Sequence, residues 1–201
     1  MLSTKAFTGM VAILFLLAAS ETDKYNVHSN LLITAAQSLQ LVFDKEFIKK
    51  HIQSLAKKLS NKRDIFVLGR DVSYPLALEA ALKIKEVTYL HAEGLAGGEL
   101  KHGTIALIEE GTPCIIFAPL DDSYDSIISN TMEIKARGAL TIGISPTYNT
   151  VFDFYIPVAD SKILTLFSNI AIIQLLAYYI AVELGNDPDK PRNLAKSVTV
   201  K

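Results

Sequence analysis

Three charged residues interrupt an otherwise apolar stretch over residues 75–92. Glu79, Lys83 and Glu86 are spaced i, i+4 and i+7, so a helix here places all three on one face. A partly buried carboxylate beside an amine can be tuned for proton transfer. The same spacing also suits an ordinary ion pair on a solvated helix face. The pattern leaves both interpretations open, whereas Lys85 lies off this line and is expected at the surface.

The next segment, His91–Gly103, reads HAEGLAGGELKHG, with two histidines, two glutamates and closely spaced glycines. The glycines predict a flexible or tightly turned loop after the helix. The spacing matches no familiar zinc or metalloprotease pattern, so we expect no metal. His102, beside Lys101, is a candidate acid–base residue, and the alternative is an ordinary surface histidine.

Alternating strands and helices are predicted to position these residues from Asp64 onward. Short apolar runs typical of buried strands lie at Ile65–Gly69, Pro113–Pro119, Ala139–Ser145 and Phe154–Val158. Helices are predicted over residues 75–92, Asp121–Arg137 and Ile163–Leu184. This order indicates the α/β class, with a doubly wound parallel sheet flanked by helices.

Ligands of such a sheet lie beyond the carboxyl ends of its strands. The segments there are Arg70–Tyr74, Pro119–Ser123 and Ser145–Thr150. None of them is a GxGxxG motif or a P-loop, and their serines are isolated, so they give only a weak indication of a phosphate site.

Residues 3–59 have a helical pattern throughout and no convincing strand. The apolar run Met10–Ala19 is too short to span a bilayer and suits either a core helix, with Ser3 or Thr4 as its N-cap, or a signal peptide. Asp44–Leu59 is predicted as an amphipathic helix. Its apolar side contains Phe47, Ile48, Ile52, Leu55 and Ala56.

Composition excludes several classes of protein. The 201 residues contain 20 Lys+Arg and 21 Asp+Glu, a net charge of -1, which argues against a nucleic-acid-coating protein or a polybasic membrane binder. Hydrophobic residues make up 50% of the chain, enough for a large core. The single cysteine, Cys114, excludes an intrachain disulfide and a cysteine-based zinc site, which fits a reducing compartment.

Two long motifs carry a specific resemblance. Ala77–Gly103 (ALEAALKIKEVTYLHAEGLAGGELKHG) and Asp189–Val200 (DKPRNLAKSVTV) closely resemble the glucosamine-6-phosphate synthase family, the isomerising glutamine–fructose-6-phosphate aminotransferases. The opening Ser3–Thr8 (STKAFT) resembles a segment near the end of that family's first sugar-isomerase lobe. The resemblance implies three parts: residues 1–59 as the helical remnant of the first lobe with a connector, 60–185 as the second lobe, and 186–201 as an active-site tail.

The resemblance also implies roles for individual residues. Glu86 resembles the base that moves a proton between C1 and C2 of the sugar, with Lys83 and Glu79 as its supports. His102 matches a ring-opening histidine that reaches the neighbouring subunit's active site. Lys196 matches a lysine that contacts, or forms an imine with, the open-chain ketose. The sugar-contacting positions are Ser3, Thr4 and Ala195.

Family members begin with a glutaminase whose catalytic cysteine is at the mature N-terminus. This chain has only Cys114, so by resemblance the glutaminase and the phosphate-binding loops of the first lobe are expected to be missing. We expect a cytoplasmic homodimer that acts on a sugar phosphate, without a cofactor, and a separate first-lobe or glutaminase chain as a further partner. The alternative is a non-catalytic sugar-phosphate-binding or structural module. The resemblance also favours a core helix over a signal peptide at Met10–Ala19.

Overall fold

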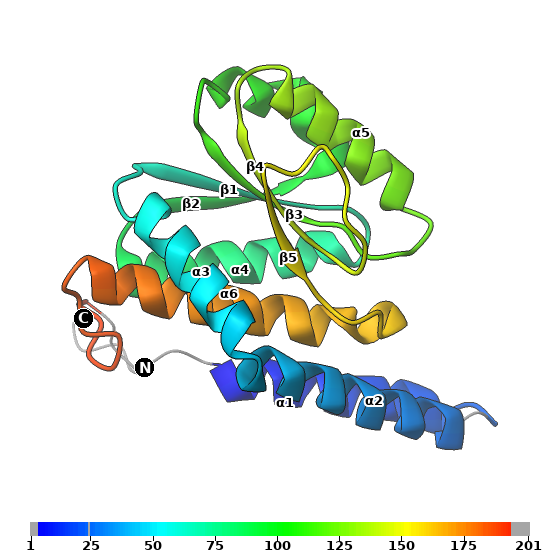
Figure 1. Ribbon diagram of the computed structural model, residues 1–201. Helices are drawn as coiled ribbons and strands as arrows, with labels where there is room; N and C mark the ends of the chain where they lie inside the picture. Colours follow the sequence, from blue (N-terminus) through cyan, green and yellow to red (C-terminus); the bar gives the residue numbers. More distant parts are fainter. Residues whose placement is uncertain (1–3, 24, 194–201) are drawn as a thin grey trace, which may run out of the picture.

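Parallel strands form one sheet with helices on both of its faces (Figure 1). The computed structural model describes residues 4–23 and 25–193, and in this part of the chain the sheet has five strands in the order β2-β1-β3-β4-β5. The strands are β1 (Asp64–Gly69), β2 (His91–Ala96), β3 (Pro113–Phe117), β4 (Leu140–Ser145) and β5 (Phe154–Pro157). Each neighbouring pair is parallel. The chain runs outward to β2 and then crosses β1 to reach β3, which confirms the predicted doubly wound fold.

Helices α3, α4 and α6 cover one face of the sheet, and α5 covers the other (Figure 1). The helices are α1 (Thr4–Ser20), α2 (Tyr25–Asp44), α3 (Glu46–Leu59), α4 (Ser73–Thr88), α5 (Tyr124–Lys135) and α6 (Thr165–Glu183). The part of the chain that the structure describes also contains the short 3₁₀ helices η1 (Gly97–His102), η2 (Thr104–Leu107) and η3 (Lys162–Leu164). No strand precedes Asp64 in the described residues, as the helical pattern predicted.

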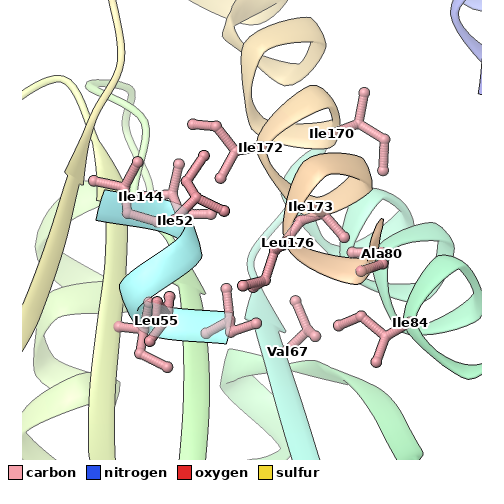
Figure 2. Packing of buried hydrophobic residues seen from close by; sticks show 14 of the residues in the cluster. Ile52, Leu55, Val67, Ala80, Ile84, Ile144, Ile170, Ile172, Ile173 and Leu176 are labelled. Atoms are coloured by element: carbon pink, nitrogen blue, oxygen red, sulfur yellow. The ribbon is translucent and has the colours of Figure 1, made fainter. Parts of the chain in front are cut away.

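The larger core lies between the sheet and the layer of α3, α4 and α6. Strand residues alternate between the two faces, so Val67 packs in this core whereas Phe66 packs in the smaller core beneath α5. Figure 2 shows side chains of α6, such as Ile173 and Leu176, lying between those of α3 and α4. These helices therefore hold α4 firmly against the sheet.

Helix α6 is the one helix in the described part of the chain that, with η3, is long and apolar enough to cross a membrane. Two thirds of its apolar window (67%) is buried in the protein interior. Its packing against both α3 and α4 accounts for its apolar composition.

The segment after α4 differs from the prediction. The helix ends at Thr88 rather than near Ala92, and the expected loop contains β2, which pairs with β1 from Asp64↔His91 to Gly69↔Ala96. A Cβ atom at Gly94 would lie 2.7 Å from the backbone of Ala77 in α4. This glycine therefore allows a close approach of helix and strand, and the prediction of a loop at this position is wrong.

The N-terminal helices are packed on one side only. Phe15 of α1 belongs to a small cluster with Ala35 of α2 and Phe167 of α6. The other side of α1 exposes the side chains of Met10, Ile13, Leu14 and Leu17. The prediction of Phe47 on the apolar side of α3 is wrong: its side chain is 68% exposed, whereas Ile48 in the same turn is buried. The buried face of α3 is centred on Ile48 and Ile52, and Phe47 lies to one side of that face.

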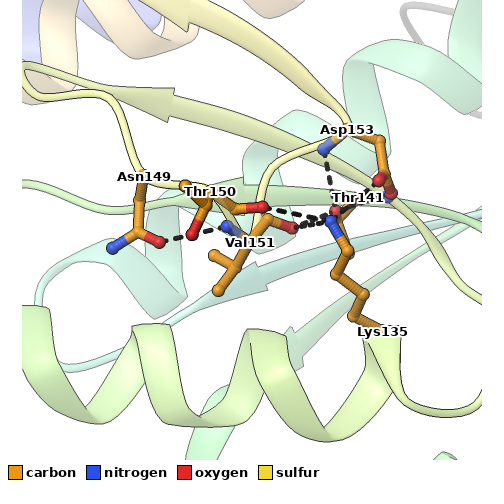
Figure 3. Close-up of polar contacts among 6 residues, drawn as sticks. All are labelled: Lys135, Thr141, Asn149, Thr150, Val151 and Asp153. Atoms are coloured by element: carbon orange, nitrogen blue, oxygen red, sulfur yellow. Dashed lines mark hydrogen bonds and ion pairs between the residues drawn. The ribbon is translucent and has the colours of Figure 1, made fainter.

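The connection between β4 and β5 contains no helix and is held by a polar network (Figure 3). Lys135 Nζ donates to the carbonyl of Val151 (3.0 Å) and to Asp153 Oδ1 (2.8 Å). Asp153 Oδ2 accepts from the backbone N–H and the hydroxyl of Thr141 (2.9 and 2.8 Å). Burial raises the pKa of Asp153, but these hydrogen bonds outweigh it and hold the pKa below its usual value.

Candidate active site

The charged row of α4 is a compact unit of three side chains, which we call the α4 triad (Glu79, Lys83 and Glu86). Lys83 Nζ lies 2.7 Å from Glu86 Oε2 and 3.4 Å from Glu79 Oε1. The Lys83 side chain is only 2% exposed, whereas the carboxylates retain 18% (Glu79) and 20% (Glu86). The predicted common face is confirmed, and the interpretation as a solvated stripe is wrong because the central amine is buried. Lys85 is exposed, as expected.

The triad carries a net charge of about -1 around a buried ammonium group. Burying a lone ammonium is costly, so the two carboxylates compensate Lys83, and Lys83 in turn keeps them close together. Lys83 occupies Oε2 of Glu86, and within the described residues Oε1 of Glu86 accepts no hydrogen bond. Glu86 is therefore a rigidly held carboxylate with one oxygen available, the arrangement that a general base requires.

The triad does not lie beyond the carboxyl ends of the strands. Helix α4 returns from the carboxyl edge to the amino edge of the sheet, so Glu86, in its last turn, lies towards the amino edge. At the carboxyl edge, the serines of the loops Pro119–Ser123 and Ser145–Thr150 make local hydrogen bonds. Ser123 Oγ donates to Asp121 (2.6 Å), and Ser145 Oγ donates to the carbonyl of Ala118 (2.7 Å).

His102 lies on the opposite face of the sheet from Glu86. It ends η1, is 73% exposed, and its Nδ1 lies 2.8 Å from Glu99 Oε2. The adjacent Lys101 pairs with Glu133 of α5 (2.8 Å), which fixes η1 on the α5 side. One copy of the chain therefore does not bring His102 and Glu86 together.

The remaining predicted site residues lie at the ends of the chain. Thr4 is the first residue of α1, and its carbonyl accepts a hydrogen bond from Thr8 Oγ1 (3.4 Å). Ser3, Ala195 and Lys196 lie outside the described residues.

Residues that the sequence analysis missed attach the chain after α6 to the end of α4. Asn186 Nδ2 donates to the carbonyls of Val87 and Thr88, and the backbone N–H of Arg192 donates to Tyr89 Oη. An Asn directly after a helix-ending glycine is a weak sequence signal for such a contact.

The amino edge also holds a cleft of about 500 Å³. Its floor includes Phe66 and Pro113, and its rim carries charges of both signs, among them Lys62 and Glu110. No triad residue lines this cleft. No group of three His, Cys, Asp or Glu residues suited to a metal ion occurs among residues 4–23 and 25–193.

Comparison with known families identifies the fold. A model described as "SIS domain" matches residues 58–181, which contain the whole sheet and the α4 triad. The chain belongs to the SIS domain family. Its SIS domain thus includes every strand described above, and helices α1 and α2 precede it.

Relatives of this SIS domain protein are named glutamine–fructose-6-phosphate aminotransferase [isomerizing]. The protein from Thermococcus kodakarensis is 41% identical and that from Agrobacterium fabrum 43% identical, each over 98% of this chain. The chain spans about a third (34%) of the length of these curated relatives.

Solved structures agree with this assignment. The C-terminal domain of glucosamine-fructose-6-phosphate aminotransferase from Francisella tularensis aligns with a TM-score of 0.71 at 30% identity, over 83% of this chain and 46% of that one. Tagatose-6-phosphate ketose/aldose isomerase from Escherichia coli aligns with a TM-score of 0.64 at 19% identity, over 77% of this chain and 44% of that one. At that identity the second match shows the fold alone.

Proposed function

We propose that this chain is the isomerase part of a glutamine–fructose-6-phosphate aminotransferase. The complete reaction makes glucosamine-6-phosphate from fructose-6-phosphate and ammonia derived from glutamine. The observation that carries the proposal is the α4 triad, in which a buried lysine holds Glu86 with one free oxygen. The names of the relatives, at about 41% identity over 98% of the chain, support it.

In this proposal Glu86 is the base that moves the proton between C1 and C2 of the open-chain sugar. Aldose–ketose isomerisation needs a carboxylate beside the α-carbon and a proton donor for ring opening. Lys83 and Glu79 hold that carboxylate, and Lys196 supplies the amine that engages the ketose carbonyl after losing its proton. Thr4, Ser3 and Ala195 contact the sugar.

His102 is the ring-opening acid in this proposal, supplied to the active site of a second copy. Its exposure and its place on the face opposite Glu86 support delivery between subunits. We therefore propose a homodimer, located in the cytoplasm. The exposed apolar row of α1, which includes Ile13 and Leu14, supports a further partner such as a first-lobe chain, and a glutaminase chain completes the reaction. We also propose residues 1–59, 60–185 and 186–201 as the functional parts.

Phosphate contacts supply much of the binding energy that orients a small sugar phosphate, and by resemblance the loops that make these contacts belong to the first lobe. We therefore expect the chain alone to isomerise fructose-6-phosphate very slowly and to make no glucosamine-6-phosphate from glutamine. Adding a separately expressed first lobe from a relative raises the isomerase rate. Full turnover by the chain alone would contradict this part of the proposal.

The decisive variant is Glu86→Gln in the complemented enzyme. Loss of the base reduces the rate of glucose-6-phosphate formation by about 10²–10⁴-fold. Glu93→Gln, at an exposed position of β2, is the matched control and leaves the rate unchanged. A complemented rate that survives Glu86→Gln would move the proton-transfer role to another residue. A chain that binds the sugar phosphate but shows no triad-dependent turnover is the alternative, a non-catalytic SIS module.

Association is tested separately by sedimentation velocity at micromolar concentration. We expect dimers or larger assemblies, because large exposed apolar patches such as that of α1 are rare on monomers. A single monomeric species would count against the proposal that His102 of one copy acts in the active site of a second copy.

A further inference from the structure

Helix η1 holds Glu99 and His102 next to each other on its exposed side. Oε2 of Glu99 lies 2.8 Å from Nδ1 of His102, three residues later in the chain. A turn of 3₁₀ helix contains three residues, so side chains at positions i and i+3 lie directly above one another. The 3₁₀ geometry of η1 therefore aligns this carboxylate with the imidazole.

The turn that carries the pair is fixed on its inner side. Leu100 is fully buried in the core beneath α5. Lys101 Nζ lies 2.8 Å from Oε1 of Glu133 in α5. The backbone on either side of these two residues is thereby held, while the side chains of Glu99 and His102, each 73% exposed, face outward. The pair is a surface feature on a firmly attached support.

The contact decides which ring nitrogen of His102 carries the proton when the ring is neutral. A carboxylate only accepts hydrogen bonds, so Nδ1 donates to Glu99 and keeps its proton. Nε2 then carries a lone pair, and it makes no hydrogen bond to the residues that the structure describes. The nitrogen that points away from Glu99 is therefore the one available to a ligand.

Opening a sugar ring needs a group that gives one proton and takes another. The bond between the anomeric carbon and the ring oxygen breaks with its electron pair on that oxygen, which takes a proton from the imidazolium. The anomeric hydroxyl becomes the carbonyl and returns its proton to the imidazole. With Nδ1 committed to Glu99, both transfers use Nε2, and the imidazolium faces a negative charge at the start and at the end.

We propose that Glu99 is a positioning residue for His102, which keeps the second ring proton on Nδ1 and leaves Nε2 to meet the sugar. This inference rests on the proposed function, in which His102 opens the sugar ring. An exposed imidazole without a partner samples several rotamers and both tautomers, so it offers the correct nitrogen in the correct direction less often. Glu99 removes that loss before the sugar binds.

Nitrogen-15 NMR of the full 201-residue chain tests the arrangement directly, because a ring nitrogen with a proton and one without resonate at different shifts. At about pH 8 an ordinary histidine is neutral. We expect the proton of His102 on Nδ1 in the wild type and loss of that preference in Glu99→Ala. Glu93→Ala, at an exposed position of β2, is the matched control and leaves the His102 signals unchanged.

Two other histidines serve as references for the two tautomers. Nε2 of His51 lies 2.9 Å from the carbonyl oxygen of Tyr155 and therefore donates to it. Nδ1 of His91 lies 2.8 Å from Oδ1 of Asp64, the same type of contact as in η1. Neither set of signals is expected to change in Glu99→Ala.

The consequence for ring opening is measured as the anomerisation of glucose-6-phosphate, followed by exchange NMR. Anomerisation opens and recloses the ring without moving a proton between C1 and C2, so the chain carries Glu86→Gln and is complemented with a first lobe. General acid–base catalysis contributes about 10²–10⁴-fold, and we expect Glu99→Ala to remove about tenfold of the enzymatic rate. Glu93→Ala is expected to leave this rate unchanged.

A proton on Nε2 of His102 in the wild type would overturn the proposal. Equal anomerisation rates in Glu99→Ala and Glu93→Ala would also overturn it, whether or not both exceed the uncatalysed rate. Circular dichroism checks that both variants are folded. Neither readout uses the step assigned to Glu86, so the proposal and the proposed function can fail independently.

Discussion

Replacing Lys83 by methionine tests the central interaction of the α4 triad. Methionine keeps an unbranched side chain of similar length and removes only the charge and the donors. The variant leaves Glu79 and Glu86 partly buried on the same face of α4, two turns apart, without the ammonium that lies between them. We expect Lys83→Met to destabilise the protein strongly.

The magnitude follows from the burial of the three groups. Removing one partner of a fully buried ion pair costs about 3–5 kcal/mol, because the remaining charge is left uncompensated. Here the ammonium is 2% exposed, but the carboxylates keep 18% and 20%, and water reaches them. The loss is therefore expected near the lower limit, about 3 kcal/mol. For a chain of this length that corresponds to a fall in Tm of about 6–12 °C.

Urea denaturation followed by circular dichroism measures this loss. Lys85→Met, on the exposed side of the same helix, is the control and is expected to change stability by less than about 0.5 kcal/mol. Adding Glu79→Gln and Glu86→Gln to Lys83→Met removes the uncompensated charges and recovers part of the loss. Equal effects of Lys83→Met and Lys85→Met would refute the reasoning, and no recovery in the triple variant would assign the loss to packing instead.

Three further outcomes are expected from the structure. Gly94→Ala places a Cβ 2.7 Å from the backbone of Ala77 and is expected to destabilise the protein by about 1–3 kcal/mol in urea denaturation. An unchanged denaturation midpoint would contradict the close approach of α4 and β2. The stability that Asp153 contributes is present above its unfolded pKa and is lost as pH falls through its lower folded pKa. Asp153→Asn therefore reduces the loss of stability below about pH 4, as measured by the free energy of unfolding from pH 7 to pH 2. Burial raises the pKa of Cys114 to about 12, so a thiol reagent at pH 8 reacts only as the chain unfolds, and fast labelling of the folded protein would show that β3 opens.

The α/β class, the α4 triad and the family resemblance all followed from local patterns in the sequence. Buried parallel strands such as β3 are short runs of apolar residues, and the i, i+4, i+7 spacing of the triad is a property of any helix. These features depend on neighbours along the chain, so the sequence alone was sufficient for them.

Strand β2 and the burial of Lys83 depended on tertiary packing. β2 lies at the edge of the sheet with His91 and Glu93 exposed and Gly94 pressed against α4, so it lacks the apolar period of a central strand. Lys83 has the same local spacing in a solvated helix as in a buried one, and only the packing of α4 against the sheet and α6 excludes water from it.

The placement of the candidate site residues shows the same division. The sequence identified Glu86 and His102 as chemically suitable residues. Their positions on opposite faces of the sheet arise because η1 packs on the α5 side, where Lys101 pairs with Glu133. The contacts of Asn186 and Arg192 with the end of α4 join residues about 100 positions apart in the chain. Contacts at such separation leave no local periodicity, so only the folded structure decides them.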